Sequence, residues 1–578
     1  MEYRVTSEAA VNDSFVLTGW VAAENAAKLT VKNGSGAEIS AKTSTFPKFD
    51  VLDAFDGDIF EDCGFSISVP LTGERLTLII EADGETADYS FKAKASGKLK
   101  MYYQKGRFYF KKWGFKRSVI RGINELYALT SDPFDYAKWL KRNPQPNAEE
   151  AKKLVDAVLK EHPEVKIVYA DSDCGLKHHF KTDFNRDMLY ATDYIGTDFV
   201  SRGDGVSSSK SLSREEAYGF CLKIYEEFGE KAFYHIPMVL FHNEEEDENY
   251  DKTPLLKLLN EHYKRIGLPA EAYLDTSDTA EGVFHTVYKW EGEPLVSVVI
   301  PNKDHTDDLD KCLGSFYRFN TYKNTEYIVV ENNSTEEETF RYYDSLKERY
   351  PEMDVKVVKW PGGFNFSAIC NFGVEHSKGE YILLQNNDTE LTTKGVVEEM
   401  LGYCRREDVG ICGARLFYFD DTIQHAGVIA GLGGIAGECF RYFARGDGGY
   451  HNRIFMPQNY SCVTAASLMT KRSVYDEVGG LDPELIVAYN DIDYCLKVIK
   501  AGYKVVYDPF AKEYHYEYKS RGKEDNPEKL ARYQREVYTF TTRWKEYIKK
   551  GDPFYNVNLT DKLQDFSLKQ KELIKIEE

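Results

Sequence analysis

The sequence predicts an α/β protein with a parallel, doubly wound sheet in its C-terminal half, preceded by a β-sandwich and a partial α/β domain. Three continuous apolar segments, LVSVVIP, YIVV and YILL, alternate with helical patterns between residues 295 and 384. Runs this short are typical of buried parallel strands. Residues 3–95 instead alternate apolar and polar positions between Gly, Asn, Asp and Pro turns, which predicts antiparallel strands.

The composition excludes several classes of protein. At about 150 residues per domain, a chain of 578 residues holds roughly three or four units, and 42% hydrophobic residues are ample for folded cores. The net charge of −20 argues against nucleic-acid binding. No apolar run reaches ~18 residues, and MEYRVTSEAAVNDS does not read as a signal peptide. The ten cysteines show no CxxC spacing, so we expect reduced thiols and a cytoplasmic protein.

Residues 1–96 are predicted to form the β-sandwich, as an accessory domain. Segments such as SFVLTGWVAA and RLTLIIEADG carry the period-two pattern, and no catalytic cluster is visible among them. Trp20, Phe55 and Phe60 fit either core packing, the commoner role of single aromatics, or a sugar-binding surface.

Residues 97–134 are predicted to form a linker. Its basic, aromatic part is positively charged in a chain whose net charge is negative. Residues 98–121, KLKMYYQKGRFYFKKWGFKRSVIR, hold nine Lys and Arg side chains and no acid, interleaved with aromatic rings. Basic groups near an anionic leaflet contribute about 1 kcal/mol each, and interfacial aromatics add to them. We therefore expect either a peripheral contact with the inner face of the plasma membrane or a basic linker that packs its rings on the next domain.

Residues 135–270 are predicted to be a truncated, inactive copy of the C-terminal domain. A helical segment, AEEAKKLVDAVLKEH, leads into a strand, VKIVYADSD, that ends in Asp171 and Asp173. This strand echoes the later one that ends in Asp388, which indicates an internal duplication. A helix at 254–266 and an irregular, acidic linker at 271–293 should then lead to the last domain.

Residues 294–578 carry the predicted functional site. The three apolar strands are followed by Asp304, Glu331 and Asp388. Because the carboxyl ends of parallel strands share one edge of a sheet, the three carboxylates should meet at one crevice. Asp388 with its flanking amides suits a hard divalent cation shared with a diphosphate, although an Asn/Asp turn that merely closes the strand would look the same.

Two further residues lie beyond this sheet edge in the sequence. Asp491 belongs to an acidic cluster, AYNDIDYC, that opens the helical segment DYCLKVIKAGYK, and near a helix N-terminus an aspartate can have the purely structural role of a cap. His515 follows the strand KVVYDPF in a predicted loop with Lys519 and Arg521, and a lone histidine is more often structural than a ligand. No GxGxxG follows LVSVVIP, so a dinucleotide-binding domain is not indicated.

The ordered set of motifs resembles the family 2 glycosyltransferases of the GT-A fold, and most closely bacterial enzymes of O-antigen, rhamnan and other surface polysaccharides. The resemblance covers residues 294–568 and rests on VSVVIPNKD, YIVVENNS, NFSAICNFGVEHSKGEYILLQNNDTEL, TIQHAGV, TAASLM, GGLDPEL, YNDIDYCLK and YHYEYKSRG. The segment YADSDCGLKHHFKTDFNRDMLYATDYIG is similar to the middle of a second such domain. The expected fold is therefore a GT-A domain with a partial GT-A-like domain before it.

The resemblance implies a role for each site residue. Pro301, Asp304 and Glu331 match residues that cradle the nucleotide, and Asn371 and Asn387 match the donor side. Asp388, His515 and Asn386 match the metal shell, with Asn386 in place of the usual first acid, and Asp491 matches the catalytic base. Gln458, Thr464 and Gly433 are candidates for the acceptor wall.

The implied enzyme is an inverting glycosyltransferase that uses Mn²⁺ or Mg²⁺. It would move a sugar from a dTDP or UDP donor to a glycan or polyprenyl-linked glycolipid, and rhamnose is the first candidate for that sugar. A carboxylate base and a cation on opposite sides of the sugar fit that chemistry. A non-catalytic scaffold that binds nucleotide-sugar or glycan is the alternative, favoured by Asn386 and Asn490. A nucleotidyltransferase is a third, although its glycine-rich phosphate loop is missing after LVSVVIP.

Overall fold

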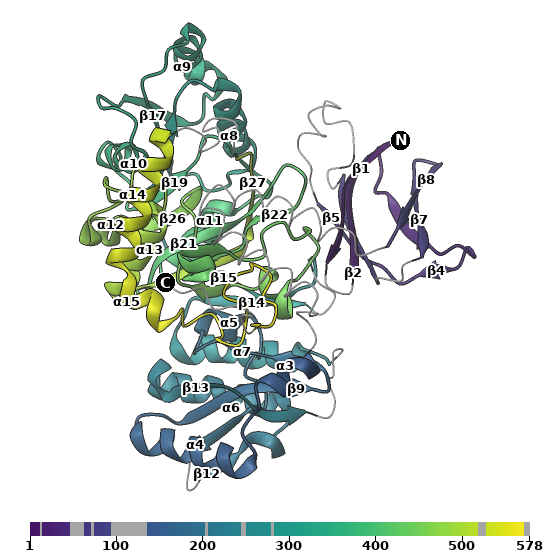
Figure 1. Ribbon diagram of the computed structural model, residues 1–578. Coiled ribbons are helices and arrows are strands. Elements are labelled where there is room, and N and C mark those ends of the chain that lie inside the picture. Colours follow the sequence, from purple (N-terminus) through teal and green to yellow (C-terminus); the bar gives the residue numbers. More distant parts are fainter. Residues whose placement is uncertain are drawn as a thin grey trace.

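The computed structural model describes residues 1–11, 14–46, 60, 63–70, 74–93, 136–202, 206–243, 250–278, 282–517 and 527–570. The N-terminal unit is the predicted β-sandwich, drawn in purple to one side of the rest (Figure 1). It consists of two four-stranded antiparallel sheets, in the orders β1-β2-β6-β5 and β4-β3-β7-β8. Its strands are β1 (Glu2–Val11), β2 (Ser14–Ala22), β3 (Lys28–Lys32), β4 (Glu38–Ile39), β5 (Lys42–Phe46), β6 (Gly64–Pro70), β7 (Arg75–Ala82) and β8 (Glu85–Lys92).

The sandwich has its own hydrophobic core, which includes Leu17, Phe65 and Leu78. Phe60 is 37% exposed and Trp20 partly buried, whereas Phe55 lies outside the described residues. The basic segment of residues 98–121 also lies outside them. Within the ranges that are described, no helix is both long and apolar enough to cross a bilayer.

The second unit is a five-stranded sheet in which β9 runs parallel to β13 and antiparallel to β10 and β11. The 3.6-residue pattern predicted for AEEAKKLVDAVLKEH is confirmed as α4, which an Asn147 and Glu150 capping box starts. The elements are α3 (Tyr136–Arg142), α4 (Ala148–Glu161), β9 (Ile167–Cys174), β10 (Lys177–His179), α5 (Arg186–Ala191), β11 (Phe199–Arg202), β12 (Val206–Ser208), η1 (Ser209–Ser211), α6 (Arg214–Phe228), η2 (Glu230–Ala232), β13 (Phe233–Asn243) and α7 (Thr253–Ile266).

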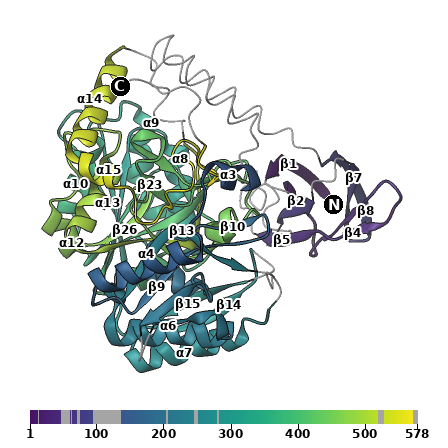
Figure 2. The same cartoon turned by 60° about the horizontal axis from the view of Figure 1, so that its bottom comes forward.

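The prediction of an irregular linker at 271–293 is wrong for about half of its length, because an antiparallel hairpin of β14 (Ala270–Asp275) and β15 (Val283–Tyr288) forms there. The hairpin lies beside α6 and α7 in Figure 2. Asn260 of α7 exchanges two hydrogen bonds with the backbone of Ala272, at 2.9 and 3.0 Å. Ala272, Val283 and Phe284 pack inward, whereas Tyr273 and Leu274 are exposed. The hairpin therefore lacks the strict alternation by which strands are predicted from sequence.

The third unit is built on a ten-stranded sheet in the order β18-β17-β16-β19-β26-β21-β27-β20, with β22 on β21 and β25 on β27. β16 to β19 are parallel, as predicted, but β26 inserts antiparallel between β19 and β21, so the sheet is mixed. Its strands are β16 (Val296–Asn302), β17 (Thr325–Glu331), β18 (Asp354–Lys359), β19 (Tyr381–Gln385), β20 (Thr389–Leu391), β21 (Val409–Phe417), β22 (Ile423–His425), β25 (Gln458–Tyr460), β26 (Ser467–Lys471) and β27 (Lys504–His515).

Helices cover both faces of this sheet, and Figure 1 shows α14 and α15 in yellow along one side. The hydrophobic clusters on the two faces are separate. The remaining elements are α8 (Thr306–Phe319), α9 (Glu337–Arg349), α10 (Phe366–Glu375), α11 (Val396–Cys404), β23 (Val428–Ala430), η3 (Leu432–Gly434), β24 (Ala436–Glu438), η4 (Tyr450–Phe455), α12 (Arg472–Val478), α13 (Asn490–Lys500), α14 (Pro527–Arg543) and α15 (Lys545–Lys550).

The second and third units share one hydrophobic core, which runs from Tyr136 to Leu568 in the sequence. Buried polar groups fasten the same contact. Arg406 pairs with both carboxylate oxygens of Asp187, and Asn185 exchanges two hydrogen bonds of 2.9 Å with the backbone of Asn459. The upstream unit is thus packed as part of the body that holds the candidate site.

Candidate functional site

The edge formed by the ends of β16, β17 and β19 is tied together by amide side chains. Asn387 donates to the side chain of Asn302 at 2.7 Å, which joins the residues just after β19 and at the end of β16. The backbone N–H of Asn332 donates to the carbonyl of Asn302 at 2.8 Å. Pro301 lies in β16, one residue before Asn302. The three strand ends therefore meet at one edge, as the alternation of strands and helices predicted.

Asp304 and Glu331 lie at this edge, and both make local bonds. Asp304 has a φ of 49° and accepts the N–H groups of Thr335 at 2.9 Å and Glu336 at 3.1 Å. Burial would raise the pKa of Asp304, but these donors hold that pKa below its ordinary value. Glu331 is 3% exposed and accepts the N–H of Ser334. Both carboxylates thus shape the turns that follow β16 and β17.

Asp388, His515 and Asn386 converge from two segments. The sequence put His515 in a loop, but it is the last residue of β27, where it pairs in register with Thr389 of β20. That pairing brings Nε2 of His515 to 3.3 Å from the Asp388 carboxylate and 3.2 Å from the Asn386 amide nitrogen. Asp388 and His515 are each 6% exposed. The group is therefore compact and largely shielded from water.

This donor set fits a divalent cation. Across the described ranges, no three His, Cys, Asp or Glu side chains gather as a metal cluster. A carboxylate oxygen of Asp388 lies 3.3 Å from Nε2 of His515. When that ring nitrogen carries no proton, both atoms are hydrogen-bond acceptors, and a cation between them would stabilise the pair. Carboxylate and imidazole suit Mn²⁺, and two protein ligands leave positions for a diphosphate.

Asp491 lies in the first turn of α13, after Tyr489, whose φ is 64°. The turn is braced from the C-terminal helices. Glu536 accepts the N–H groups of Val487 and Ala488, and Arg543 and Trp544 each donate to Asp493 at 2.8 Å. Asp491 itself is half-buried. The helix start fixes the carboxylate without enclosing it.

Burial raises the pKa of Asp491, the N–H of Ala465 opposes the rise, and the charge of Glu438 adds to it. The N–H of Ala465 donates to Asp491 at 3.2 Å, and the N–H of Asn386 donates to the carbonyl of Ala466 at 2.9 Å. Asp491 and Asn386 are therefore bound to consecutive residues of the segment before β26. The residues that the resemblance assigns as base and as metal ligand therefore lie at the two ends of one short link.

Glu438 and His425 are a pair that sequence reasoning did not select. His425 is completely buried, and its Nδ1 lies 2.6 Å from Glu438. Its Nε2 has no hydrogen-bond partner in the part of the chain that the structure describes. The motif TIQHAGV contained His425, but its contact with Glu438 requires the β23–β24 hairpin.

The structure separates the three acceptor candidates. Thr464 hydrogen-bonds Asp491 and lies beside it. Gly433 is exposed, and its N–H donates to the carbonyl of Asp561 at 2.8 Å. Gln458 is fully buried and bonds Arg453 and Met456, so it presents no atom to an acceptor. The amide of Asn371 is engaged with Tyr475 and the backbone of Leu481, and holds the loop after α12.

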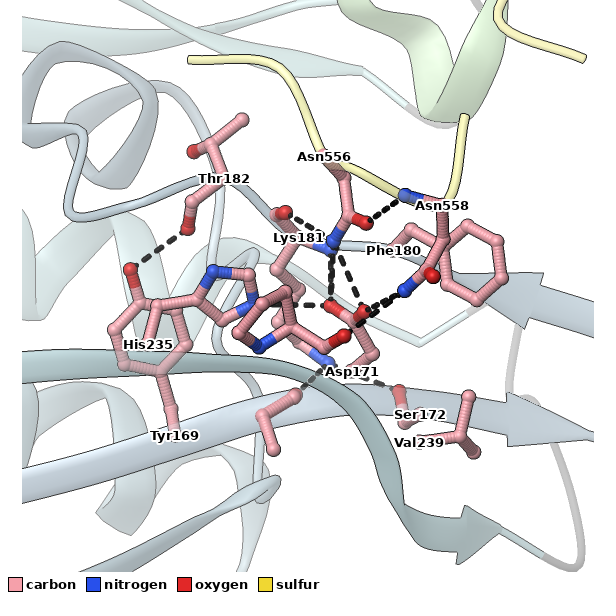
Figure 3. A network of polar contacts seen from close by, with 12 residues as sticks. Tyr169, Asp171, Ser172, Phe180, Lys181, Thr182, His235, Val239, Asn556 and Asn558 are labelled. Carbon is pink, nitrogen blue, oxygen red and sulfur yellow. Dashed lines mark hydrogen bonds and ion pairs between the residues drawn. The ribbon is translucent and has the colours of Figure 1, made fainter. Parts of the chain in front are cut away.

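The strand predicted to end in Asp171 and Asp173 continues to Cys174, so both acids lie within β9, where other parts of the protein bind them (Figure 3). Asp171 is completely buried and accepts the Asn556 amide on both oxygens, the N–H of Lys181 and Nε2 of His235, at 2.8 to 2.9 Å. Asn558 donates to it at 3.2 Å. Asp173 binds Tyr136 and His242. Asp171 and Asp388 thus both contact a histidine, but Asp171 is also bound by the C-terminal segment through Asn556 and Asn558.

Residues 297–479 match the family model described as Glycosyl transferase family 2. They form a family 2 glycosyltransferase domain. The α/β sheet around them is that of the GT-A fold implied by the resemblance, although β26 makes it mixed where the sequence predicted a parallel sheet. The match covers the edge with Asp304, Glu331 and Asp388 and stops before Asp491 and His515, which contact the matched residues Ala465 and Asp388.

Two curated proteins are similar over most of this chain. An uncharacterized protein, y4gI, of Sinorhizobium fredii is 36% identical over 436 residues, which cover 72% of this chain and 47% of that protein. The O-antigen biosynthesis protein RfbC of Myxococcus xanthus is 28% identical over 428 residues, which cover 71% of this chain and 32% of that protein. The chain thus spans half or less of the length of both relatives.

Two solved structures are similar in fold to part of the chain. A mannosyltransferase from Pyrobaculum calidifontis in complex with GDP-Man and Mn²⁺ aligns over 45% of this chain and 69% of its own, with 14% identity and a TM-score of 0.33. GalNAc-T7 with UDP, GalNAc and Mn²⁺ aligns over 48% of this chain and 52% of its own, with 15% identity and a TM-score of 0.37. Both scores are low, so the family assignment rests on the sequence match.

Proposed function

We propose that the chain is an inverting, metal-dependent glycosyltransferase that moves a sugar from a nucleoside-diphosphate donor to a hydroxyl of a bacterial surface polysaccharide. The observation that carries this proposal is the link between Asp491 and Asn386 through residues 465 and 466. It supports a base on one side of the transferred sugar and a diphosphate-binding group on the other. The likeness to a protein of O-antigen biosynthesis supports the substrate class.

The donor diphosphate belongs, in this proposal, beside Asp388 and His515. Together with the Asn386 amide they would hold Mn²⁺ or Mg²⁺, which when bound neutralises the departing diphosphate as a Lewis acid. Their low exposure supports the role, because electrostatic attraction is stronger away from water. Pro301, Glu331 and Asn387 would frame the nucleotide at the same edge, with Asp304 and Asn371 holding the turns around it.

Asp491 would act as the general base. Its pKa is raised by burial, so the carboxylate is a stronger proton acceptor than an exposed aspartate, while it remains half-open to a substrate. The acceptor hydroxyl would give its proton to Asp491 as its oxygen attacks the anomeric carbon, and the diphosphate would leave on the opposite face. A single displacement of this kind inverts the anomeric centre and needs no covalent intermediate.

The donor and the place of action are finer proposals. Rhamnose from a dTDP donor is the first choice, on the resemblance to rhamnan and O-antigen enzymes, and UDP-hexoses are the second. A polyprenyl-linked acceptor would bring the enzyme to the inner face of the plasma membrane, where the basic and aromatic residues 98–121 suit anionic lipid. Liposome co-sedimentation tests this contact, and binding that ignores both anionic lipid and neutralisation of Lys111, Lys112, Lys116 and Arg117 would contradict it.

One assay tests the proposed function as a whole. The full chain is incubated with dTDP-rhamnose or UDP-sugars, Mn²⁺ and bacterial polysaccharide fragments, and nucleoside diphosphate is measured. Release that depends on acceptor is expected, and inversion is read from the anomeric configuration of the product by NMR. Release of pyrophosphate would indicate a nucleotidyltransferase instead.

A scaffold that only binds nucleotide-sugar or glycan is the second candidate. The observation that favours it is Asn386, a neutral side chain directed at His515 where the family commonly has an acid. Donor binding without any release of nucleoside diphosphate, across the same set of donors and acceptors, would support the scaffold and contradict the enzyme.

A further inference from the structure

Two exposed aromatic residues lie on the turns that follow β21 and β24. Phe419 is 70% exposed and Tyr442 is 47% exposed. Tyr442 stacks on the ring of Tyr418, with centroids 5.3 Å apart and planes 9° apart, and Tyr418 is only 8% exposed. Tyr418 therefore supports one face of Tyr442 from below, and the half-exposed ring is held flat toward solvent. We call Tyr418, Phe419 and Tyr442 the aromatic platform.

A charged pair lies against the platform. The Arg441 guanidinium is 5.5 Å from the Tyr418 ring centroid and 5.2 Å from that of Tyr442. Arg441 donates to Glu517 at 2.9 Å, and the Tyr418 hydroxyl donates to the same carboxylate oxygen at 3.2 Å. The pair carries no net charge and offers both donors and acceptors. Such a rim suits neutral hydroxyl groups better than a phosphate.

The backbone of the platform is held in an unfavourable conformation. Tyr442 has a φ of 68° and Asp421 one of 62°, values that bulky or charged L-residues seldom adopt. Hydrogen bonds fix them: the N–H of Tyr442 donates to the carbonyl of Ile423 at 2.8 Å, and the N–H of Ile423 to that of Phe443 at 2.7 Å. Strain of this kind persists where surrounding structure enforces it, which is commonest at binding sites.

The platform and its turn are bonded to two residues that lie close to His515 in the sequence. The Tyr514 hydroxyl bonds the Asp421 carboxylate, and Glu517 bonds Tyr418. These two anchors flank His515 in the sequence. Two steps along the chain, of about 3.8 Å each, bring Glu517 within about 8 Å of His515 between Cα atoms. On the other side, Tyr442 follows Glu438, the carboxylate whose charge acts on Asp491, by four residues.

We infer that the aromatic platform with Arg441 and Glu517 is a saccharide-binding subsite for the acceptor glycan, next to the acceptor hydroxyl. The inference rests on the proposed function and specifies its acceptor side. One C–H face of a pyranose ring packs on Tyr442 or Phe419, and hydroxyl groups at its edge bond Arg441 and Glu517. An aromatic ring with a polar rim is the arrangement that binds a surface apolar on one face and wet at its edge. The subsite would select acceptors longer than one sugar.

Glycan binding by a catalytically disabled full chain tests this inference. The probe is an array of bacterial surface-polysaccharide fragments of one to four sugar units, and the protein is Asp491→Asn. Phe419→Ala and Tyr442→Ala are added to it singly and together, and Tyr442→Phe restores the ring. Tyr273→Ala is the matched control, because Tyr273 is 45% exposed and lies on the β14–β15 hairpin. Thermal unfolding confirms that each variant is folded.

Fragments of two or more units should bind more tightly than single sugars. The double variant should weaken that binding about tenfold, which corresponds to about 1.4 kcal/mol, while Tyr442→Phe and Tyr273→Ala should leave it unchanged. Equal binding by the double variant, or no glycan bound at all, would overturn the inference. Platform variants that lose binding of UDP but keep binding of the glycan fragments would also overturn the inference. The proposed function is judged separately, by release of nucleoside diphosphate from the wild-type chain.

Discussion

Asn556 donates its amide to both carboxylate oxygens of Asp171, at 2.9 Å each, and so brings the C-terminal segment onto strand β9 of the upstream unit (Figure 3). In the family 2 domain, Asp388 follows the buried strand β19 and lies 3.3 Å from His515. Both carboxylates contact a histidine, but Asp171 also binds the side chain of Asn556 and the backbone of Lys181. Asp171 is therefore a structural joint between distant parts of the chain, whereas Asp388 is the candidate metal ligand.

Replacing Asp171 should destabilise the protein without stopping the chemistry. Asp171→Asn leaves His235 and Asn556 without their charged partner in a buried site, and breaking such a contact costs about 3 kcal/mol. We expect a lower urea midpoint and near-normal transfer in the folded fraction. Asp183→Asn is the control, because Asp183 also contacts His235 but its side chain is 62% exposed. Full stability with lost transfer would mean that the upstream strand end takes part in catalysis.

Asp491→Asn should remove transfer and leave donor binding intact. The asparagine keeps an oxygen for the N–H of Ala465, so the fold is preserved, but it cannot take a proton. Loss of a general base costs about 10²- to 10⁴-fold in kcat. Turnover and binding of the nucleoside diphosphate are measured together, with the exposed Asp476→Asn as control. Unchanged turnover would refute the assignment of the base.

The rate should fall on the acid side with the ionisation of Asp491. Burial and the charge of Glu438 raise the pKa of Asp491, so its base form is lost at a higher pH than for an exposed aspartate. Glu438→Gln removes that charge, lowers the pKa of Asp491 and should move the acid limb of kcat/KM to lower pH. If the acid limb of the kcat/KM profile stayed in place or moved to higher pH in Glu438→Gln, the effect of the Glu438 charge on Asp491 would be contradicted.

Chelation should suppress transfer, and Mn²⁺ or Mg²⁺ should restore it. Full activity in the presence of chelator would remove the cation from the mechanism. Binding of Mn²⁺, followed by electron paramagnetic resonance, tests the ligands without turnover. His515→Ala should weaken binding, since it removes the imidazole nitrogen 3.3 Å from Asp388.

The Asn386 position offers a test in the opposite direction. Asn386→Asp adds a carboxylate beside His515 and should tighten Mn²⁺ binding, because ligand charge increases affinity for a divalent ion. Asn387→Asp is the matched control: it adds the same charge one residue away, where the side chain points to Asn302. Equal tightening by the two variants would indicate a general charge effect rather than coordination by residue 386.

The sequence by itself determined the β-sandwich, the strands that end at Asp304, Glu331 and Asp388, and the family 2 resemblance. Each of these follows from local periodicity or from short contiguous motifs, which a linear reading detects. It did not reveal the antiparallel β26, the β14–β15 hairpin or the place of His515 in a strand. These features depend on pairing between segments that are distant in the sequence, and neither segment by itself shows which partner it pairs with.

Which polar groups are bound inside the protein and which are candidates for a ligand depends on tertiary contacts. Asp171 and Asp388 looked alike in the sequence, but Asp171 lies within β9 and is bound by Asn556, whereas Asp388 follows β19 and lies beside His515. Gln458 looked available and is buried, while Glu438 went unnoticed and lies near Asp491. The physical reason is that burial and hydrogen-bond partners come from residues far apart in the chain, and they set whether a carboxylate is a joint, a base or a ligand.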